Sequence, residues 1–271
     1  MGALSHAHFT KPAGVGYPDA AVQSVSVTTQ SPRNPLSALG YKGVVGFIRQ
    51  PDTADVTVEE FLPANVTHWS TATAASPSTG TTKLQDVAVA DDLNPEGVDI
   101  AGALGCVLTG VTFNFNAGQP ARVTWTYLGK GGLAALNEVV NPAHGTGEEK
   151  TVLLWEDVNL VTGSLNLDFS NGPISGIQSV TFTGTINKDT LFALGTSGVY
   201  QHVTTFPTNV SVNIESYENL TQATNVSGNI AVGPVRAINA RQNSRGQNIA
   251  VGGFRTNTES YTAADLEWYT Q

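Results

Sequence analysis

The segments LSALGYKGV (residues 36–44) and LFALGTSGV (residues 191–199) are two copies of one pattern, Leu-x-Ala-Leu-Gly-x-x-Gly-Val. Their numbering differs by a constant offset (191 − 36 = 155), and the same offset aligns Gln-Ser-Val at 23–25 with Gln-Ser-Val at 178–180. Two copies of one segment in a chain of 271 residues predict a duplicated domain.

The alignment extends to residues 55–58, which match residues 209–212 after the offset slips by one. We expect the repeated leucines to form an apolar knuckle, because they precede a glycine turn. One glycine allows a turn with positive φ and the other starts a strand, so a side chain at Gly40 or Gly195 should strain the turn. The residues that we assign to the structural repeat are Leu36, Leu39, Gly40 and Gly43 in the first copy and Leu191, Leu194, Gly195, Gly198, Tyr200 and Pro207 in the second.

The composition is typical of β-strands joined by turns. Charged residues make up 13% of the chain, against roughly 25% in an average soluble domain, and Thr, Ser, Asn, Gly and Val are abundant. The net charge of −9 argues against a protein that binds nucleic acid through its phosphates, which needs clustered Lys and Arg. The single cysteine, Cys106, excludes an intramolecular disulfide framework and fits a reducing cytoplasm.

Neither end of the chain nor its interior shows a targeting or membrane segment. Residues 1–10 lack both a basic start and an apolar stretch, and no run of 18 apolar residues occurs. We therefore expect no signal peptide and no membrane partner.

Alternating apolar and polar residues predict strands along most of the chain. Residues 44–48 and 56–61 are expected to form a hairpin that bends at Pro51 and Asp52. A short helix is expected over 133–140. The expected strands cover 22–27, 44–48, 56–61, 107–116, 122–128, 151–155, 158–169, 178–183, 199–204 and 209–217.

Three segments lack this alternation. Residues 1–21 are expected to form an extended N-terminal arm, and residues 63–100 a long exposed loop. Loops of this length in a compact domain tend to be functional or disordered. Residues 143–150 are rich in Gly, Thr and Glu and are the best linker candidate. The domains are therefore predicted to span 22–150 and 151–271.

Motifs for catalysis and metal binding are weak. His6 and His8 share a face of an extended arm, but no Cys, Asp or Glu accompanies them to complete a metal site. Residues 129–132 read GKGG, which lacks the spacing of a phosphate-binding loop. No Gly-x-Ser-x-Gly occurs, and adjacent carboxylates such as Glu59 and Glu60 point to opposite faces of a strand. We predict no enzyme, no cofactor and no metal.

Charge is unevenly distributed. Residues 51–100 carry nine acids and one base, a net −8, whereas residues 219–258 carry four bases and no acid, a net +4. Two explanations stay open: solvated faces or pairs inside one subunit, and complementary surfaces between subunits. The candidates for subunit contacts are Asp86, Asp91, Asp92, Glu96, Arg236, Arg241, Arg245 and Arg255.

The second copy resembles a segment of long-tailed bacteriophage tail tube proteins. In those chains a Leu-x-x-Leu-Gly-x-x-Gly-x-Tyr stretch leads through Phe-Pro into a Val-x-Val strand, and this sequence has the same pattern from Leu191 through Tyr200, Phe206 and Pro207 to Val212. The first copy departs from the pattern. It has Val45 in place of Tyr and Gln50-Pro51 in place of Phe-Pro.

The resemblance implies an all-β fold of two tandem β-sandwich or partial-barrel domains, each with at most a short flanking helix. It also implies a structural virion protein of the phage tail, made in the host cytoplasm. Its partners would be other copies of itself, in a trimer with pseudo-sixfold symmetry or a hexamer, with rings stacked into a tube. Other tail proteins would bind the tube ends, and DNA would pass through without specific binding.

Two other classes are compatible with a Thr- and Asn-rich β-protein. A surface β-sandwich adhesin or carbohydrate-binding module should show a secretion signal or exposed aromatics beside acids. A secreted polysaccharide hydrolase would need two convergent carboxylates.

Overall fold

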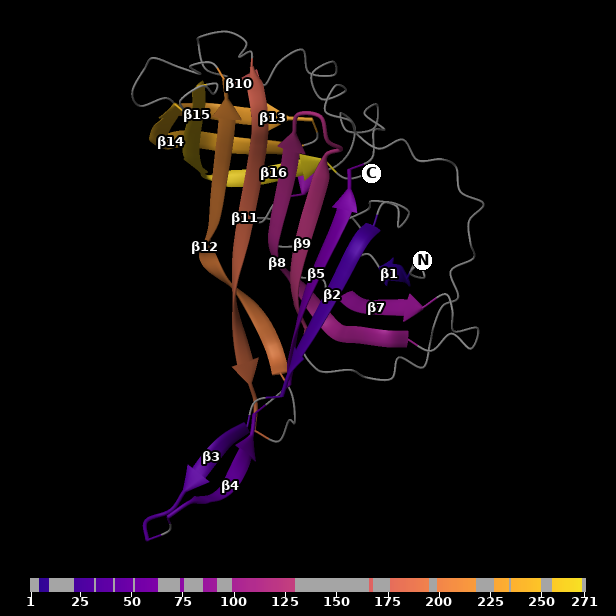
Figure 1. Cartoon of the computed structure of the whole chain (residues 1–271). Coiled ribbons are helices and arrows are strands. Elements are labelled where there is room, and N and C mark those ends of the chain that lie inside the picture. The colour runs from indigo at the N-terminus through magenta and orange to yellow at the C-terminus, as the bar shows by residue number, and fades with distance from the viewer. Residues whose placement is uncertain are drawn as a thin grey trace.

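The computed structural model describes residues 5–9, 22–31, 33–40, 42–50, 52–62, 74–75, 85–91, 99–129, 166–167, 176–194, 199–217, 227–233, 235–249 and 255–269. All of the regular elements in these segments are β-strands, which confirms the predicted all-β class (Figure 1). The described segments contain no helix long and apolar enough to cross a membrane.

Within these segments, sixteen strands follow one another along the chain. They are β1 (Ser5–Phe9), β2 (Val22–Gln30), β3 (Arg33–Ser37), β4 (Val44–Arg49), β5 (Thr53–Phe61), β6 (Ala74–Ala75), β7 (Gln85–Asp91), β8 (Asp99–Asn116), β9 (Arg122–Gly129), β10 (Asn166–Leu167), β11 (Ile177–Phe192), β12 (Val199–Ser216), β13 (Ser227–Val232), β14 (Val235–Ile249), β15 (Arg255–Ala263) and β16 (Asp265–Tyr269).

Fourteen of these strands form one sheet, which continues beyond β14 to β13 and β10. Its central run of eight strands, called the central sheet below, has the order β2-β5-β9-β8-β11-β12-β15-β14, and every neighbouring pair is antiparallel. Alternation places apolar side chains on one face. In β9, Val123, Trp125 and Tyr127 are buried while their neighbours are partly exposed, and in β8 the same holds for Val111 and Phe113. These are the faces that the sequence predicts.

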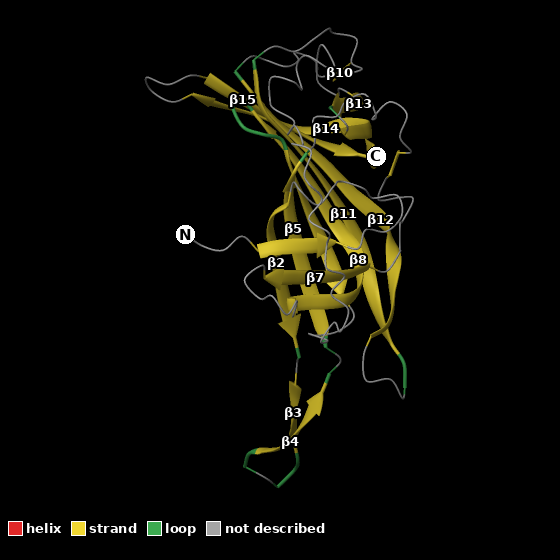
Figure 2. Cartoon of the chain, turned by 90° about the vertical axis from the view of Figure 1, so that its right-hand side faces the viewer, coloured by secondary structure: helices red, strands yellow, loops and turns green. Residues whose placement is uncertain are grey.

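The buried face is covered by further strands. Figure 2 shows β7 crossing in front of the long strands of the central sheet. The Trp268 ring, on β16, lies 5.8 Å from the Trp125 ring and 6.0 Å from the Phe113 ring. One hydrophobic core cluster extends through both halves of the chain.

The repeat in the sequence corresponds to a repeat of strand pairing. Adding 155 to each residue number takes β2 and β3 together onto β11 (22 + 155 = 177 and 37 + 155 = 192). In the first copy Leu36 lies opposite Gly46 and Ser37 opposite Val44, with a shift of register between the two pairs. The same shift occurs between Leu191 and Phe192 of the second copy.

The correspondence reaches strands whose sequences share no pattern. Leu108 of β8 lies opposite Tyr127 of β9, and a bulge follows before Gly110. Adding 134 to both numbers gives Gln242 of β14 and Tyr261 of β15 (108 + 134 = 242 and 127 + 134 = 261), which also lie opposite each other and are also followed by a bulge. The four-strand order β2-β5-β9-β8 thus recurs as β11-β12-β15-β14.

Two details of the predicted pairing are wrong. Residues 44–48 and 56–61 do not form a hairpin, because β4 pairs with β3 while β5 pairs with β2 and β9. The chain instead runs out along β2 and β3 and returns along β4 and β5. The second error concerns the alignment of the repeat. Val56 lies opposite Val27, and Val212 lies opposite Phe182. Because Val27 and Phe182 are equivalent in the repeat (27 + 155 = 182), Val56 corresponds to Val212 and not to Val210. The difference is two residues, so the side chains stay on the same face.

The predicted loop of residues 63–100 is also wrong in part. It contains β6, β7 and the start of β8, and β7 pairs with both β1 and β8. Strand β1 lies within the expected N-terminal arm. The strands expected at 199–204 and 209–217 are one strand, β12.

Several expectations lie outside the described residues, among them the helix at 133–140, the linker at 143–150 and the strand at 151–155. The division into domains at 22–150 and 151–271 stays a prediction.

Candidate assembly surfaces

Both repeat hairpins end in exposed leucines. Leu36 and Leu191 are 45% and 44% exposed, and Leu39 and Leu194 are 106% and 107% exposed. The repeated leucines, which the sequence predicts to form an apolar knuckle, are therefore exposed to solvent in both copies. Single exposed apolar residues are normal on a protein surface, but here the exposure recurs at equivalent positions, which points to a shared contact.

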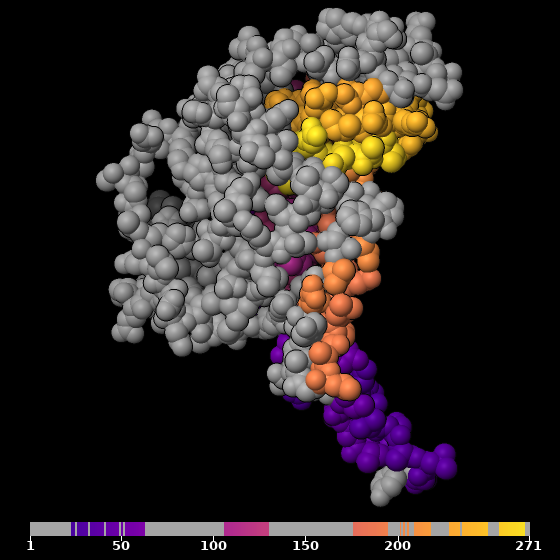
Figure 3. All heavy atoms as spheres, turned by 180° about the vertical axis from the view of Figure 1, so that it is seen from behind, coloured from indigo at the N-terminus to yellow at the C-terminus, as the bar shows by residue number. Residues whose placement is uncertain are grey.

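The β3–β4 hairpin adds further apolar surface. Val44, Val45, Phe47 and Ile48 are all exposed. The hairpin and the far ends of β11 and β12 project from the same end of the molecule (Figures 1 and 3). Covering such side chains stabilises a contact by about 1.5–3 kcal/mol each when burial is complete.

One of the two turn glycines has the expected conformation. Gly40 has a φ of 93°, which favours glycine, and an added Cβ would meet no atom within 4 Å. Gly43 lies in equally open space without a positive φ. Gly195 and Gly198 lie outside the described residues, and Tyr200 and Pro207 lie within β12.

The face of the central sheet that points away from the core is lined by neutral polar side chains. They alternate with buried residues along β5, β8, β9, β11, β12 and β15. Representative members are Ser26, Thr28, Thr57, Thr112, Asn114, Thr124, Thr126, Thr181, Thr183, Ser211, Asn213, Thr258, Thr262 and Asn248. We call this surface the polar face.

Charged groups on the polar face are sparse. Along the described parts of its strands they are Asp55, Glu59, Arg122, Glu215 and Arg241, and Lys188 of β11 lies beside polar-face threonines such as Thr183. Two of them neutralise each other, since Arg122 forms an ion pair of 2.8 Å with Glu59. The polar face therefore presents mainly hydroxyl and amide groups.

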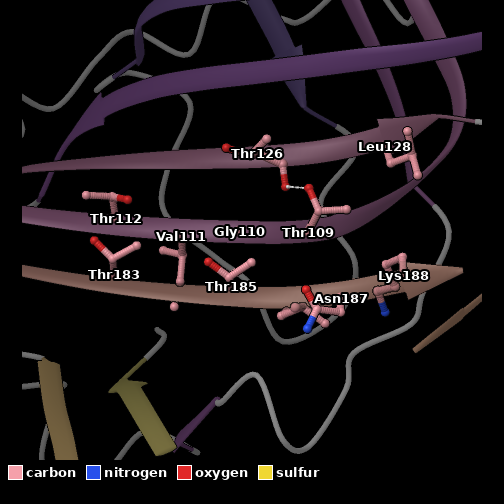
Figure 4. Close-up of a pocket in the computed structure, with 12 residues that line it drawn as sticks. Thr109, Gly110, Val111, Thr112, Thr126, Leu128, Thr183, Thr185, Asn187 and Lys188 are labelled. Carbon is pink, nitrogen blue, oxygen red and sulfur yellow. Dashed lines mark hydrogen bonds between the residues drawn. The ribbon is translucent and has the colours of Figure 1, made fainter. Parts of the chain in front are cut away.

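A depression of about 440 Å³ lies where β8 meets β11 (Figure 4). Its lining includes Thr109, Thr126, Thr183 and Thr185, and the Thr109 hydroxyl donates to the carbonyl of Thr126 at 3.0 Å. Lys188 contributes an amine, and burial lowers the pKa of that amine. The lining is suited to hydrogen bonding with a neutral polar surface.

The candidate charged contacts fall into separate places. Arg245 lies 3.4 Å from the buried Glu259 carboxylate, so its charge is used inside the subunit. Asp86 and Asp91 lie on β7, which pairs with β1 and β8, whereas Arg236 and Arg241 lie on β14. The two sets do not face each other across paired strands. Arg255 begins β15, and Asp92 and Glu96 lie outside the described residues.

The described strands leave both ends of the central sheet uncovered, one wholly and one in part. β2 pairs only with β5. Arg241 of β14 pairs with both β13 and β15, so these lie on opposite edges of β14, and the pairing with β13 ends there. No described strand covers that edge from Gln242 to Ile249.

Sequence reasoning indicated surfaces covered by neutral polar groups, but it missed these edges and did not place those groups on one face of a single sheet. The signal for the face was the alternation of Thr, Ser and Asn with apolar residues. No signal identified the edges, because the order of the strands depends on pairings between residues far apart in the chain. The pairing of β8 with β11, which brings Thr112 opposite Thr183, is an example.

No known protein family matches the sequence, and no curated protein matches it.

Proposed function

We propose that the chain is the major tail tube subunit of a long-tailed bacteriophage, a structural protein that forms stacked rings around a channel for DNA. The observation that carries the proposal is the head-to-tail repeat of the sheet. One four-strand unit, β2-β5-β9-β8, is followed by an equivalent unit, β11-β12-β15-β14, and the last strand of the first unit pairs with the first strand of the second.

A sheet built in this way can continue from one copy to the next. Contacts between unlike surfaces generate closed rings when the rotation between copies closes, and filaments when it does not. A ring of three copies would contain six equivalent four-strand units, two from each chain. This is the pseudo-sixfold trimer that the resemblance implies.

The polar face supports a conduit. DNA binds proteins mainly through Lys and Arg that contact its phosphates. A sheet face with few bases, in a chain with a net charge of −9, would hold DNA weakly and let it slide. In the proposed ring this face lines the channel.

The exposed hairpin ends support stacking. The hairpin ends that carry Leu39 and Leu194 point to the same end of the molecule, where a second ring would cover them. Rings stacked through these ends would gain apolar burial at two equivalent sites in each subunit.

Negative-stain electron microscopy of the purified protein tests the proposal, with mass photometry of the same sample. We expect rings or tubes, and a ring mass of three times the 28.3 kDa of one chain. Six times that mass would indicate a hexamer. Monodisperse monomers at all concentrations, together with binding to glycans, would support the adhesin or carbohydrate-binding alternative instead.

A further inference from the structure

Strand β2 ends the strand order on one side, and on the other side the described strands leave the segment of β14 from Gln242 to Ile249 uncovered, beyond its pairing with β13. We propose that β14 of one copy pairs antiparallel with β2 of the next copy, in the register that β8 and β11 already use within the chain. The inference rests on the proposed ring-forming function and specifies the residues of its interface.

The β8–β11 junction is the template. Asn114 lies opposite Thr181, and Gly110 lies opposite Thr185. The side chains of one such pair also bond, because the Thr181 hydroxyl donates to Asn114 Oδ1 at 3.1 Å. This junction connects the end of the first unit to the beginning of the second.

The repeat transfers the template to the free edges. Adding 134 to a residue number takes β8 to β14, and subtracting 155 takes β11 to β2. Asn248 of one copy (114 + 134) therefore lies opposite Ser26 of the next (181 − 155). By the same arithmetic Ser244 (110 + 134) lies opposite Gln30 (185 − 155).

The faces of the two strands match in this register. Asn248 and Ser26 both belong to the polar face, and the inward positions bring Gln247 opposite Val27, which packs against the core. Because side chains alternate along a strand, a slip by one residue would turn the apolar side chain of Val27 to the polar face. The polar face therefore continues across the interface.

The chemistry of the template pair is also repeated. Asn248 has the same side chain as Asn114, and Ser26 has a hydroxyl where Thr181 has one. The Ser26 hydroxyl can therefore donate to Asn248 Oδ1 of the neighbouring copy. These two side chains are exposed in the single chain and are accessible to a partner.

Four double cysteine variants of the full-length chain test the register. Two combine residues predicted to be opposite, Ser26→Cys with Asn248→Cys and Gln30→Cys with Ser244→Cys. Two matched controls exchange the partners, Ser26→Cys with Ser244→Cys and Gln30→Cys with Asn248→Cys. The exchanged partners are displaced by four positions, which places them about 13 Å apart along the strand, beyond the reach of a disulfide. The native Cys106 is buried and does not compete.

After mild oxidation, non-reducing electrophoresis should show covalent oligomers for the predicted pairs and monomers for the exchanged pairs. If rings form but the exchanged pairs cross-link equally well, or if neither set cross-links, the register is wrong while the ring-forming function stands. If the predicted pairs cross-link into open chains and microscopy shows no rings or tubes, the edge pairing stands and the tail tube proposal fails.

Discussion

Tyr127 and Tyr261 occupy equivalent places in the two halves of the central sheet, each opposite the last residue before a bulge in the neighbouring strand. Both phenols have a pKa above the ordinary value. Burial is the main cause in both, and a carboxylate adds to it, Glu60 for Tyr127 and the hydrogen-bonded Glu259 for Tyr261. The repeat therefore places an alkaline-sensitive group in each half.

The raised pKa of Tyr127 predicts a specific alkaline response. A raised pKa means that the folded state favours the neutral phenol, so this contribution to stability is complete below the unfolded pKa of about 10 and is lost as the pH rises above it. In Tyr127→Phe the unfolding free energy should fall less steeply above pH 10 than in the native chain. Denaturant unfolding followed by circular dichroism at several pH values measures this slope, with the exposed Tyr217→Phe as control. Equal slopes for Tyr127→Phe and the native chain would contradict the prediction.

The Arg245–Glu259 pair predicts a loss and a rescue. The Glu259 side chain is fully buried and also accepts a hydrogen bond from the Tyr261 hydroxyl. Removing one partner of a fully buried pair costs about 3–5 kcal/mol, and because the Arg245 side chain is 27% exposed, Arg245→Met should lower the unfolding free energy by less than that. Adding Glu259→Gln should restore part of it, because no buried charge is left alone. A loss that the second substitution does not reduce would rule out this role for the pair.

The positive φ of Gly40 predicts a local cost that Gly43 does not share. Gly40→Val should destabilise the β3–β4 turn by about 1 kcal/mol or more, whereas Gly43→Val occupies equally open space without a positive φ. Amide hydrogen exchange of residues 33–49 measures the difference. Gly195→Val should behave like Gly40→Val, because Gly195 holds the same place in the repeat. If amide exchange is unchanged in Gly40→Val, the turn does not require glycine at this position.

The exposed leucines predict that assembly and folding separate. Leu39→Ser combined with Leu194→Ser should leave the melting temperature unchanged, since both side chains are fully exposed in the single chain. The same variant should form rings that do not stack into long tubes. Gln201→Ser is the control, because Gln201 is an exposed polar residue of β12, in the hairpin that carries Leu194. Tubes of normal length from the leucine variant would show that these ends are not the stacking contact.

Charge reversal on the β14 surface is best made at Arg241, because Arg245 already pairs inside the subunit. We propose that the acidic segment of residues 63–100 contacts a different subunit and that Arg241, on the outermost strand of the polar face, is a partner for it at the margin of that face. Arg241→Glu, or deletion of residues 76–82, should leave a folded chain that stacks poorly at physiological salt. This deletion spares Ala74 and Ala75, which pair with β16. Exposed ion pairs contribute only about 0–1 kcal/mol each, so tube length and not melting temperature is the quantity to measure. Normal tubes from both variants would make the segment a passive surface feature.

The sequence predicts the strands well where burial is one-sided. Val123, Trp125 and Tyr127 alternate with polar residues, and their shared buried face follows directly. The exposure of Leu39 and Leu194 could not be predicted, because a leucine beside a turn glycine is equally compatible with a buried knuckle.

The second level of the repeat was hidden for a chemical reason. Strand β8 and strand β14 share a register and a bulge, yet a core valine, Val111, corresponds to Arg245 of the ion pair. Backbone hydrogen bonding preserves such a relationship without preserving side-chain type. The correspondence of β8 with β14 is therefore visible in the strand pairing and not in the sequence.

The paired bulges have a consequence for curvature. A bulge bends its strand and increases the local twist, and here the extra residues are Thr109 and Asn243, one in each half of the sheet. These two bulges place a bend on the last strand of each four-strand unit. In a closed ring the circumference would consist of six equal arcs, and the bend at each bulge would set the radius of the channel. In the proposed ring, deleting Thr109 or Asn243 would flatten one arc in two, so the channel width would depend on two bulge residues, one in each half of the sheet.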